Sequence, residues 1–409
     1  MAKKRMALIL SAVMAASMMV VPVNAEDVLI TSFDAHGMAL EEYEAMVAGF
    51  TEQTGIEVEM QHAANDNVAL LQSRLNSGNL PDAFNVESGT QSSMYAEYAY
   101  DWSNDTDVLE LFQPGTLDRC KDEEGRIYGL PWAFENMGFL YNKDCFEKAG
   151  IEKLPVNVEE LEAACEKLEA AGITPFALAG SHTWVISQMV SHFLIDKSLG
   201  GGVETNQALL NGDITVAELP NIDNLFKMLD LIIKYGDAKQ LEYDWEKSEA
   251  LFATGEAAMI EMGDWCQSMI DSYNPDANVG YMPMPVGETA EDCTVLSQCN
   301  WMYIVNKDSE NLDAAKEYVK YILTSHEGTK WLAQCQGLVP AAKTDNEVTS
   351  KLAQDCVQYI EAGVTRSWLH NDAPADYSSM VGGAVQAYIL GTMTKEDVIA
   401  ESQAVWDNA

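Results

Sequence analysis

The stretch Gly125–Lys143, GRIYGLPWAFENMGFLYNK, decides how this chain is organised. Pro131 has a fixed φ and holds the residue before it in extended geometry, so GLPW predicts the end of one strand and a turn. The apolar run MGFLY that follows predicts the next strand. Glu135 and Asn136 lie between the two, close to the ring of Trp132. Polar groups beside an apolar surface are typical of a small-molecule cleft where two lobes meet.

The sequence before this stretch alternates between strand and helix patterns. Residues 28–33, 56–60 and 82–86 are predicted strands, and the apolar residues at 40–50 and 68–75 have helical spacing. This β-α-β-α-β order predicts a mostly parallel sheet with right-handed crossovers and flanking helices. Ligands bind such sheets beyond the carboxyl ends of the strands.

The same pattern returns after the quoted stretch and predicts a second α/β lobe. Asn157, followed three residues later by Glu160, resembles a capping box that begins a helix, and residues 173–178 follow as a strand. The apolar run 295–305 and the segment 337–340 predict further crossings towards the first lobe. Several crossings explain why no single boundary divides the chain.

Polar and aromatic side chains follow the predicted strands, as they do at the quoted join. Asp34, His36, Glu87 and Ser88 follow strands of the first half. Those that follow strands of the second half are Ser181, His182, Trp184, Asp264 and Trp265. The mixture suits sugars, because their C–H faces lie on aromatic rings and their hydroxyl groups bond to carboxylates and amides. An ordinary polar loop is the alternative interpretation of each segment.

The composition predicts a folded protein with two domains. The chain has 409 residues, of which 47% are hydrophobic and 9% aromatic, so its formal charge of −40 does not indicate disorder. The negative charge counts against nucleic-acid binding, which needs a basic face, and against anionic membrane surfaces. We interpret the acidity as a solvated surface.

The N-terminus has the pattern of a secretory signal peptide. Basic residues at 3–5 precede an apolar run at 6–21, and small residues end at Ala25. We therefore expect cleavage after Ala25 and export, either to the periplasm or to the cell exterior and its surface. No cysteine lies near this point, so no lipid attachment is predicted.

The remaining cysteines and histidines do not indicate a metal site. Export permits disulfides, but the sequence does not choose among the 105 pairings of eight cysteines. No Cys-x-x-Cys pair and no cysteine–histidine cluster has zinc spacing. The histidines outside the predicted strand ends are interpreted as surface or satisfied polar residues; they are His62, His192, His326 and His370.

Other classes of protein remain as alternatives. Two carboxylates at a defined separation could hydrolyse a glycosidic bond, which makes a secreted carbohydrate-active enzyme the competing hypothesis. The motifs Gly-x-Ser-x-Gly and His-Glu-x-x-His are both absent. A secreted structural or adhesion protein would not need polar groups after so many strands.

Several blocks of the sequence, taken together and in order, resemble a known family. They are TGIEVEMQ, SGNLPDAF, GRIYGLPW, MGFLYNKDCFEKAGI, LEAACEKLEAAGITPFALAG, FATGEAAMIEMGDW, VNKDSENLDAAKEYVKYI and TKEDVIAESQ. The chain is similar over nearly its whole length to the sugar-binding, maltose-binding-protein-like type of extracellular solute-binding protein that serves ABC importers. Many Gram-positive relatives carry a lipid-anchoring cysteine after the signal, and this chain does not.

The resemblance implies a periplasmic-binding-protein fold with two α/β lobes. The first lobe would hold residues 26–134 and 298–340, and the second would hold residues 136–296 and 341–409. Each lobe would be a mostly parallel sheet flanked by helices. A hinge of several strands would join them near residues 135, 297 and 340.

The resemblance also implies ligand contacts at matching positions. Glu135 lies at the hinge, Trp184 follows a strand of the second lobe, Trp265 ends the GDW block, and Tyr377 matches a C-terminal aromatic of the family. Less specific matches are Asn136, Ser181, His182, Asn300, Trp301, Arg366 and Trp368. The pair Asn300-Trp301 and Trp368 could equally belong to the core or rim. Arg366 is the one cation expected near the cleft, so an acidic ligand is not expected.

These observations predict an exported receptor that closes on a sugar or oligosaccharide and delivers it to a membrane permease. We expect a monomer that performs no chemistry and uses no cofactor, metal or nucleic acid. A carbohydrate-active enzyme is the alternative, as is a binding protein for a polyol or a peptide.

Overall fold

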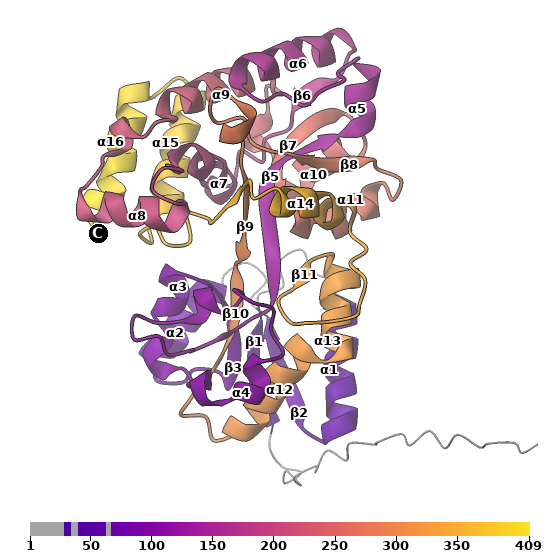
Figure 1. Cartoon of the computed structure of the whole chain (residues 1–409), viewed down its shortest axis with the longest axis vertical. Helices are drawn as coiled ribbons and strands as arrows, with labels where there is room; N and C mark the ends of the chain where they lie inside the picture. The colour runs from indigo at the N-terminus through magenta and orange to yellow at the C-terminus, as the bar shows by residue number, and fades with distance from the viewer. Residues whose placement is uncertain (1–27, 34–39, 63–66) are drawn as a thin grey trace, which may run out of the picture.

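The computed structural model describes residues 28–33, 40–62 and 67–409. Figure 1 shows two lobes one above the other, with the N-terminal strands in the lower lobe and the C-terminal helices in the upper lobe. The predicted signal segment 1–25 lies outside the described residues, as do Asp34 and His36. No helix among the described residues is both long and apolar enough to cross a bilayer.

The first sheet has the strand order β2-β1-β3-β10-β4. Its strands are β1 (Val28–Phe33), β2 (Glu57–His62), β3 (Ala83–Glu87), β4 (Leu130–Pro131) and β10 (Trp301–Val305). β1 lies parallel to both β2 and β3, as the alternating pattern predicts. β10 comes back from the second lobe and runs antiparallel to β3 and β4, with Trp301 opposite Glu87.

Helices cover the first sheet and share one hydrophobic core with it. They are α1 (Leu40–Thr54), α2 (Asn67–Asn76), α3 (Thr90–Ser93), α4 (Thr106–Leu109), α12 (Leu312–Thr324) and α13 (His326–Lys330), followed by a π-helical turn at Trp331–Gln336. Apolar residues of α1 at helical spacing face the core, as the sequence predicts. Within that core the hydroxyl group of Tyr43 lies 2.9 Å from that of Tyr303 and 2.8 Å from that of Tyr318.

The second sheet is built around one long strand, β5 (Ala133–Asn142). The other strands are β6 (Thr174–Phe176), β7 (Ala257–Gly263), β8 (Val279–Met282), β9 (Val295–Cys299), β11 (Val339–Pro340) and β12 (Thr365–Arg366). β7, β8, β9 and β11 all pair with β5 in antiparallel orientation. The two-lobed α/β fold is confirmed, but this sheet is mixed rather than mostly parallel. The reason is that the chain enters the lobe along β5 and the strands beside it run back.

Ten helices of the described chain surround the second sheet. They are α5 (Lys143–Lys148), α6 (Val158–Ala170), α7 (Thr183–Leu194), α8 (Gly202–Asn211), α9 (Ile222–Tyr235), α10 (Trp245–Ala253), α11 (Gln267–Tyr273), α14 (Lys351–Glu361), α15 (Tyr377–Ile389) and α16 (Lys395–Asp407). α6 begins at the predicted cap, where the backbone N–H of Glu160 donates to the side chain of Asn157 at 2.9 Å. Its apolar face packs into the core of this lobe.

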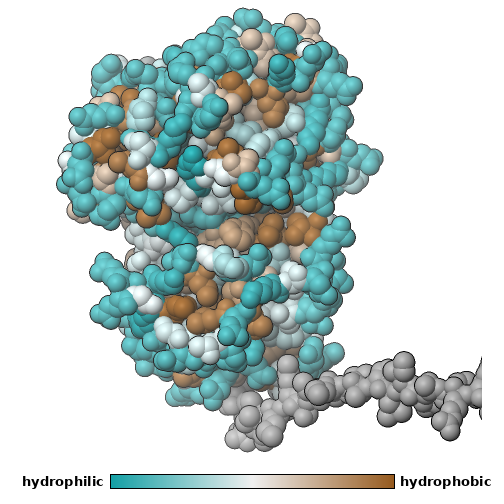
Figure 2. Space-filling view, viewed as in Figure 1, coloured by the Kyte–Doolittle hydropathy of each residue, from teal (hydrophilic) through white to brown (hydrophobic). Residues whose placement is uncertain are grey.

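The chain passes directly from one sheet to the other at two neighbouring points, and a third passage leads from β10 to β11 of the second sheet. Trp132 separates β4 from β5, and Asn300 separates β9 from β10. The backbone N–H of Trp132 donates to the carbonyl group of Trp301 at 3.2 Å, which ties the two crossings together. β5 and β9 are visible between the lobes in Figure 1, and hydrophobic residues gather at the waist in Figure 2. The predicted lobe ranges and hinge positions stay a prediction.

Replacing Tyr281 with phenylalanine tests how β5 is held in place. The fully buried hydroxyl group of Tyr281 donates to the carbonyl oxygen of Asn136 at 2.6 Å. Without this donor the carbonyl group stays buried and unpaired, so we expect the free energy of unfolding to fall by about 1–3 kcal/mol. Denaturant titration measures the change. Tyr273→Phe, at a ring that is 43% exposed, is the control and should change nothing. Equal stability of the wild type and Tyr281→Phe would contradict the assignment.

Candidate functional site

A buried hydrogen bond joins the two crossings, between Asn300 and Glu135 near the start of β5. Asn300 donates from Nδ2 to Oε2 of Glu135 at 2.9 Å, and the two side chains are 3% and 4% exposed. The carbonyl group of Asn300 accepts from the backbone N–H of Ser88 at 2.6 Å, which brings in the end of the first sheet. Glu87 therefore lies near Glu135. The join and the end of β3, which the sequence singled out separately, form one site.

The next residue of β5 makes a second polar pair. Asn136 donates from its backbone N–H to Oδ1 of Asp264 at 3.0 Å and from Nδ2 to Oδ2 at 2.6 Å. Asp264 follows β7 and is fully buried. Successive side chains of a strand point to opposite faces, so β5 presents Glu135 on one face and Asn136 on the other.

Burial raises the pKa values of these carboxyl groups. The pKa of Glu135 lies well above its usual range because of desolvation; the hydrogen bond from Asn300 opposes this effect, and the charges of Asp264 and Glu87 add to it. Burial also raises the pKa of Asp264 to about 7, against the effect of the two bonds from Asn136. The raised pKa favours the neutral form of Glu135. Asp264, with a pKa of about 7, can either donate or accept a hydrogen bond near neutral pH.

Aromatic rings surround these carboxyl groups. The ring centroids of Trp265 and Trp368 lie 5.9 Å apart, and those of Trp368 and His370 lie 5.0 Å apart with planes inclined by 35°. Trp265 is partly exposed and packs against the hydrophobic clusters of both lobes. On the first-lobe side, Trp301 lies 6.1 Å from Trp132. Indole faces of this kind suit the C–H face of a sugar.

Several buried polar atoms near these rings make no hydrogen bond within the described part of the chain. They are Nε1 of Trp368, both ring nitrogens of His370, Oδ2 of Asp372 and Oδ1 of Asn136. Burial, together with the positive charge of Arg119, lowers the pKa of His370 to about 3, so the neutral ring has one donor and one acceptor. Each buried unpaired group costs about 1–3 kcal/mol, which a ligand with matching hydroxyl groups recovers.

The sequence does not predict two features of this region, the cation Arg119 and the loop at 370–373. Arg119 donates to Oδ1 of Asp372 at 3.0 Å and lies 3.4 Å from Oγ of Ser88. The guanidinium of Arg366 bonds to the carbonyl groups of residues 363 and 365 in its own turn, and its place near the cleft stays a prediction. The interpretation of His370 as a surface or satisfied residue is wrong. Neither the turn around Arg119 nor the loop at 370–373 has an apolar period, so no sequence pattern indicates these residues.

The remaining predicted residues lie at the start of α7 and in the core of the second lobe. Tyr377 is a core residue: it is 2% exposed, its ring packs on Trp406, and its hydroxyl group donates to the carbonyl of Ser187. The polar and aromatic residues at the start of α7 are Ser181, His182 and Trp184. The rings of His182 and Trp184 lie 5.9 Å apart, and no hydrogen bond joins these three residues to Glu135 or Asp264.

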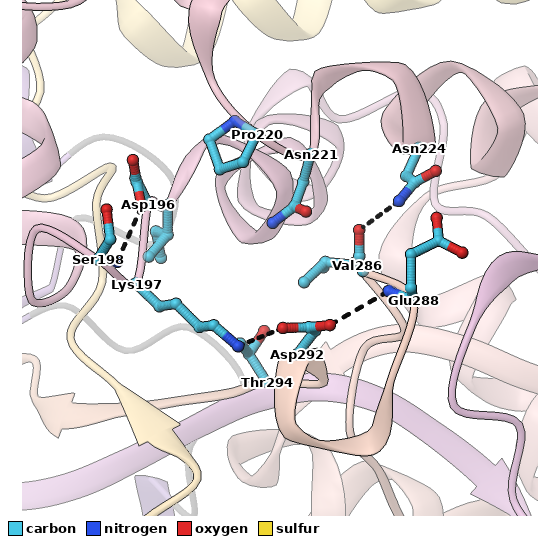
Figure 3. Close-up of a pocket in the computed structure, with 12 residues that line it drawn as sticks. Asp196, Lys197, Ser198, Pro220, Asn221, Asn224, Val286, Glu288, Asp292 and Thr294 are labelled. Atoms are coloured by element: carbon cyan, nitrogen blue, oxygen red, sulfur yellow. Dashed lines mark hydrogen bonds and ion pairs between the residues drawn. The ribbon is translucent and has the colours of Figure 1, made fainter.

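Two surface hollows lie elsewhere, within the second lobe. One of about 360 Å³ lies between the start of α9 and the loops at 195–198 and 286–294 (Figure 3). Lys197 and Asp292 form an ion pair on its wall, and Asn224 donates to the carbonyl group of Val286. The other, of about 380 Å³, lies beside β6. Among the predicted site residues that the structure describes, none lines either hollow.

The cysteines and acidic residues show no metal centre in the described ranges. No group of three or more histidine, cysteine, aspartate or glutamate side chains there is arranged to hold a metal ion. All eight cysteines lie within these ranges and are free, and seven of them are buried.

Comparison with known proteins gives the family. A family model described as bacterial extracellular solute-binding protein matches residues 39–329. The chain belongs to this family. The resemblance seen in the sequence is therefore confirmed.

Individual members of this solute-binding family are similar at low identity. An ABC transporter extracellular-binding protein of Pyrococcus horikoshii is 26% identical over 67% of this chain, and the match spans 61% of that relative. MelE of Bacillus subtilis, a melibiose/raffinose/stachyose-binding protein, is 23% identical over 83% of this chain and 80% of its own length. The structure of RafE in complex with raffinose superimposes with a TM-score of 0.81 at 21% identity, covering 93% of this chain and 99% of RafE.

Replacing Asp264 with asparagine should remove part of the pH dependence of stability. Burial raises the pKa of Asp264 from 3.8 to about 7, so between these values the folded protein keeps a proton that the unfolded chain releases. The stability that this proton contributes is complete below about pH 4 and is lost as the pH rises through about 7. At roughly 1.4 kcal/mol per pKa unit, the loss is at most about 4 kcal/mol.

Thermal melts of the wild type and Asp264→Asn from pH 4 to pH 8 measure this effect. The melting temperature of the wild type should fall relative to that of the variant as the pH rises. A constant difference across this range would contradict the raised pKa.

Proposed function

We propose that this chain is an exported receptor that captures a sugar or oligosaccharide between its two lobes and delivers it to the permease of an ABC importer. One observation carries the proposal. Buried donors and acceptors without partners, on Trp368, His370 and Asp372, lie in the same region as carboxyl groups and partly exposed indole rings. A sugar offers the matching hydroxyl groups and C–H faces.

The charge of the region favours a neutral ligand. Glu87, Glu135, Asp264 and Asp372 surround it, against the single guanidinium of Arg119. A carboxylate on the ligand would be buried beside these acidic groups, and Arg119 already pairs with Asp372. Burying an unpaired ion costs several kcal/mol. Uronic acids should therefore bind poorly.

The relatives support the same class of ligand. MelE is named for melibiose, raffinose and stachyose, and RafE was solved with raffinose bound. For this chain we propose a neutral sugar or oligosaccharide, without assigning its identity. We further propose that the protein acts as a monomer without a cofactor, and that it performs no chemistry on its ligand.

The lobe assignment completes the proposal. We assign residues 26–134 and 298–340 to the first lobe and residues 136–296 and 341–409 to the second. The change of sheet at Trp132 and at Asn300 supports joints near residues 135 and 297. The N-terminal pattern supports cleavage of the signal peptide after Ala25.

A thermal-shift screen of the purified protein against melibiose, raffinose, stachyose and glucuronic acid tests the function. A ligand that binds only the folded state raises the melting temperature by mass action. We expect a rise with at least one neutral sugar, which chromatography should recover intact, and no rise with glucuronic acid. Recovery of cleaved sugar would contradict the proposed receptor and indicate a hydrolase. If none of these sugars raises the melting temperature, the result would favour a different solute.

Replacing Glu135 with glutamine tests the central contact. An amide in place of the carboxyl group leaves a buried hydrogen bond to the sugar mismatched, which costs about 1–3 kcal/mol, so the affinity for a sugar that binds the wild type should fall roughly 5- to 100-fold. Glu361→Gln makes the same chemical change at an exposed position of α14 and should leave the affinity unchanged. Titration calorimetry measures both. An unchanged affinity of Glu135→Gln would remove Glu135 from the binding site.

A further inference from the structure

Four side chains form a chain of hydrogen bonds that all point the same way. The backbone N–H of Trp368 donates to Oε1 of Gln298 at 3.1 Å, and Nε2 of Gln298 donates to Oδ1 of Asn371 at 3.2 Å. Asn371 then donates from Nδ2 to Oδ1 of Asn300 at 2.6 Å. Asn300 donates to Glu135 at 2.9 Å, so the chain ends on the buried carboxyl group.

This alignment is physically meaningful because hydrogen bonds in a row polarise one another. In a buried setting, each donor is strengthened by the bond behind it. Gln298, Asn300 and Asn371 are all at most 6% exposed, so water does not compete for these bonds. The last donor in the row, Asn300, therefore opposes the rise in the pKa of Glu135 that desolvation causes.

The same residue, Asn371, also touches the opposite lobe. Its carbonyl oxygen accepts from the backbone N–H of Thr90 at 2.8 Å, and the hydroxyl group of Thr90 donates to the carbonyl of Ala373 at 3.1 Å. Next to it, Asp372 pairs with Arg119 at 3.0 Å. Thr90 and Arg119 lie between β3 and β4, in the first lobe. Residues 371–373 lie between β12 and α15, in the second lobe.

We propose that Asn371 is a positioning residue that couples closure of the lobes to the orientation of Asn300 and Glu135 in the sugar site. Contact with Thr90 and Arg119 holds the loop at 370–373 in place. The loop in turn holds the amide of Asn371 against Asn300. The inference rests on the proposed function for the role of Glu135, but the contact between the lobes is independent of any sugar.

The close approach of the lobes depends on a glycine. Gly89 has a φ of +95°, and a Cβ atom there would lie 2.4 Å from the carbonyl oxygen of Asn371. Such a distance is far inside van der Waals contact, so any side chain would separate the two loops. Gly78 also has a positive φ, of +66°, but has nothing within 4 Å of the corresponding position. It controls for placing an alanine at a positive φ where no such contact is made.

Small-angle X-ray scattering of ligand-free wild type, Gly89→Ala, Arg119→Gln and Gly78→Ala tests the contact between the lobes. We expect Gly89→Ala and Arg119→Gln to have a larger radius of gyration than the wild type, and Gly78→Ala to match it. Arg119→Gln keeps the test valid if Gly89→Ala does not fold. Equal radii for all folded variants would overturn the inference.

A double-mutant cycle with raffinose tests the link to Glu135. Asn371→Asp has the same shape but no donor for Asn300, so we expect it to lower the affinity about tenfold, and less than threefold in a Glu135→Gln background. Asn408→Asp, at an exposed position, controls for the added charge. Equal losses in both backgrounds would overturn the coupling. Absence of binding by every sugar tested would count against the proposed function, and the scattering comparison would still decide whether the lobes are held by this contact.

Discussion

The hydrogen bond between Asn300 and Glu135 is the interaction on which the rest of the site depends. It joins two of the points at which the chain crosses between sheets, and it lies where water does not reach. Burying a carboxyl group is costly unless its oxygens are bonded. The neighbouring features all act on this cost. Asn300 lowers it, and the nearby charges of Asp264 and Glu87 raise it. A sugar hydroxyl group placed between the lobes would lower it further.

The geometry also explains why so acidic a protein can hold a polar, uncharged ligand. Most of its carboxylates are on the surface, where Figure 2 shows a largely hydrophilic face. The few that are buried have raised pKa values, so near neutral pH they act partly as neutral acids. His370 is kept neutral by burial and by the nearby Arg119. The region therefore presents hydrogen-bonding groups with little net charge, which matches hydroxyl groups better than ions.

The sequence predicts the parts of this site that follow from strand topology. Glu87 ends β3 and Asp264 follows β7, so the rule that ligands bind beyond strand ends points to both. Glu135 lies near the start of β5 and is predicted from its place at the join between two strands. The rule does not find Arg119 and Asp372, which are 253 residues apart. Arg119 lies in a single 3₁₀ turn at Asp118–Cys120 and Asp372 in a loop, and neither segment has an apolar period. Tyr377 is expected at the site because it matches a C-terminal aromatic of the family, but its side chain packs in the core of the second lobe. The sequence also does not predict that strands pair with β5 in antiparallel orientation, because the pattern of a strand does not show the direction of its neighbours.

A crystal structure of the protein with raffinose or another neutral sugar from the screen tests the central claim most directly. The account predicts the sugar between the lobes, with hydroxyl groups within hydrogen-bonding distance of Trp368 Nε1, Asp372 Oδ2 and Glu135, and with its ring on Trp265. A sugar bound instead in the hollow beside Lys197 and Asp292, with the atoms between the lobes still unpaired, would contradict it.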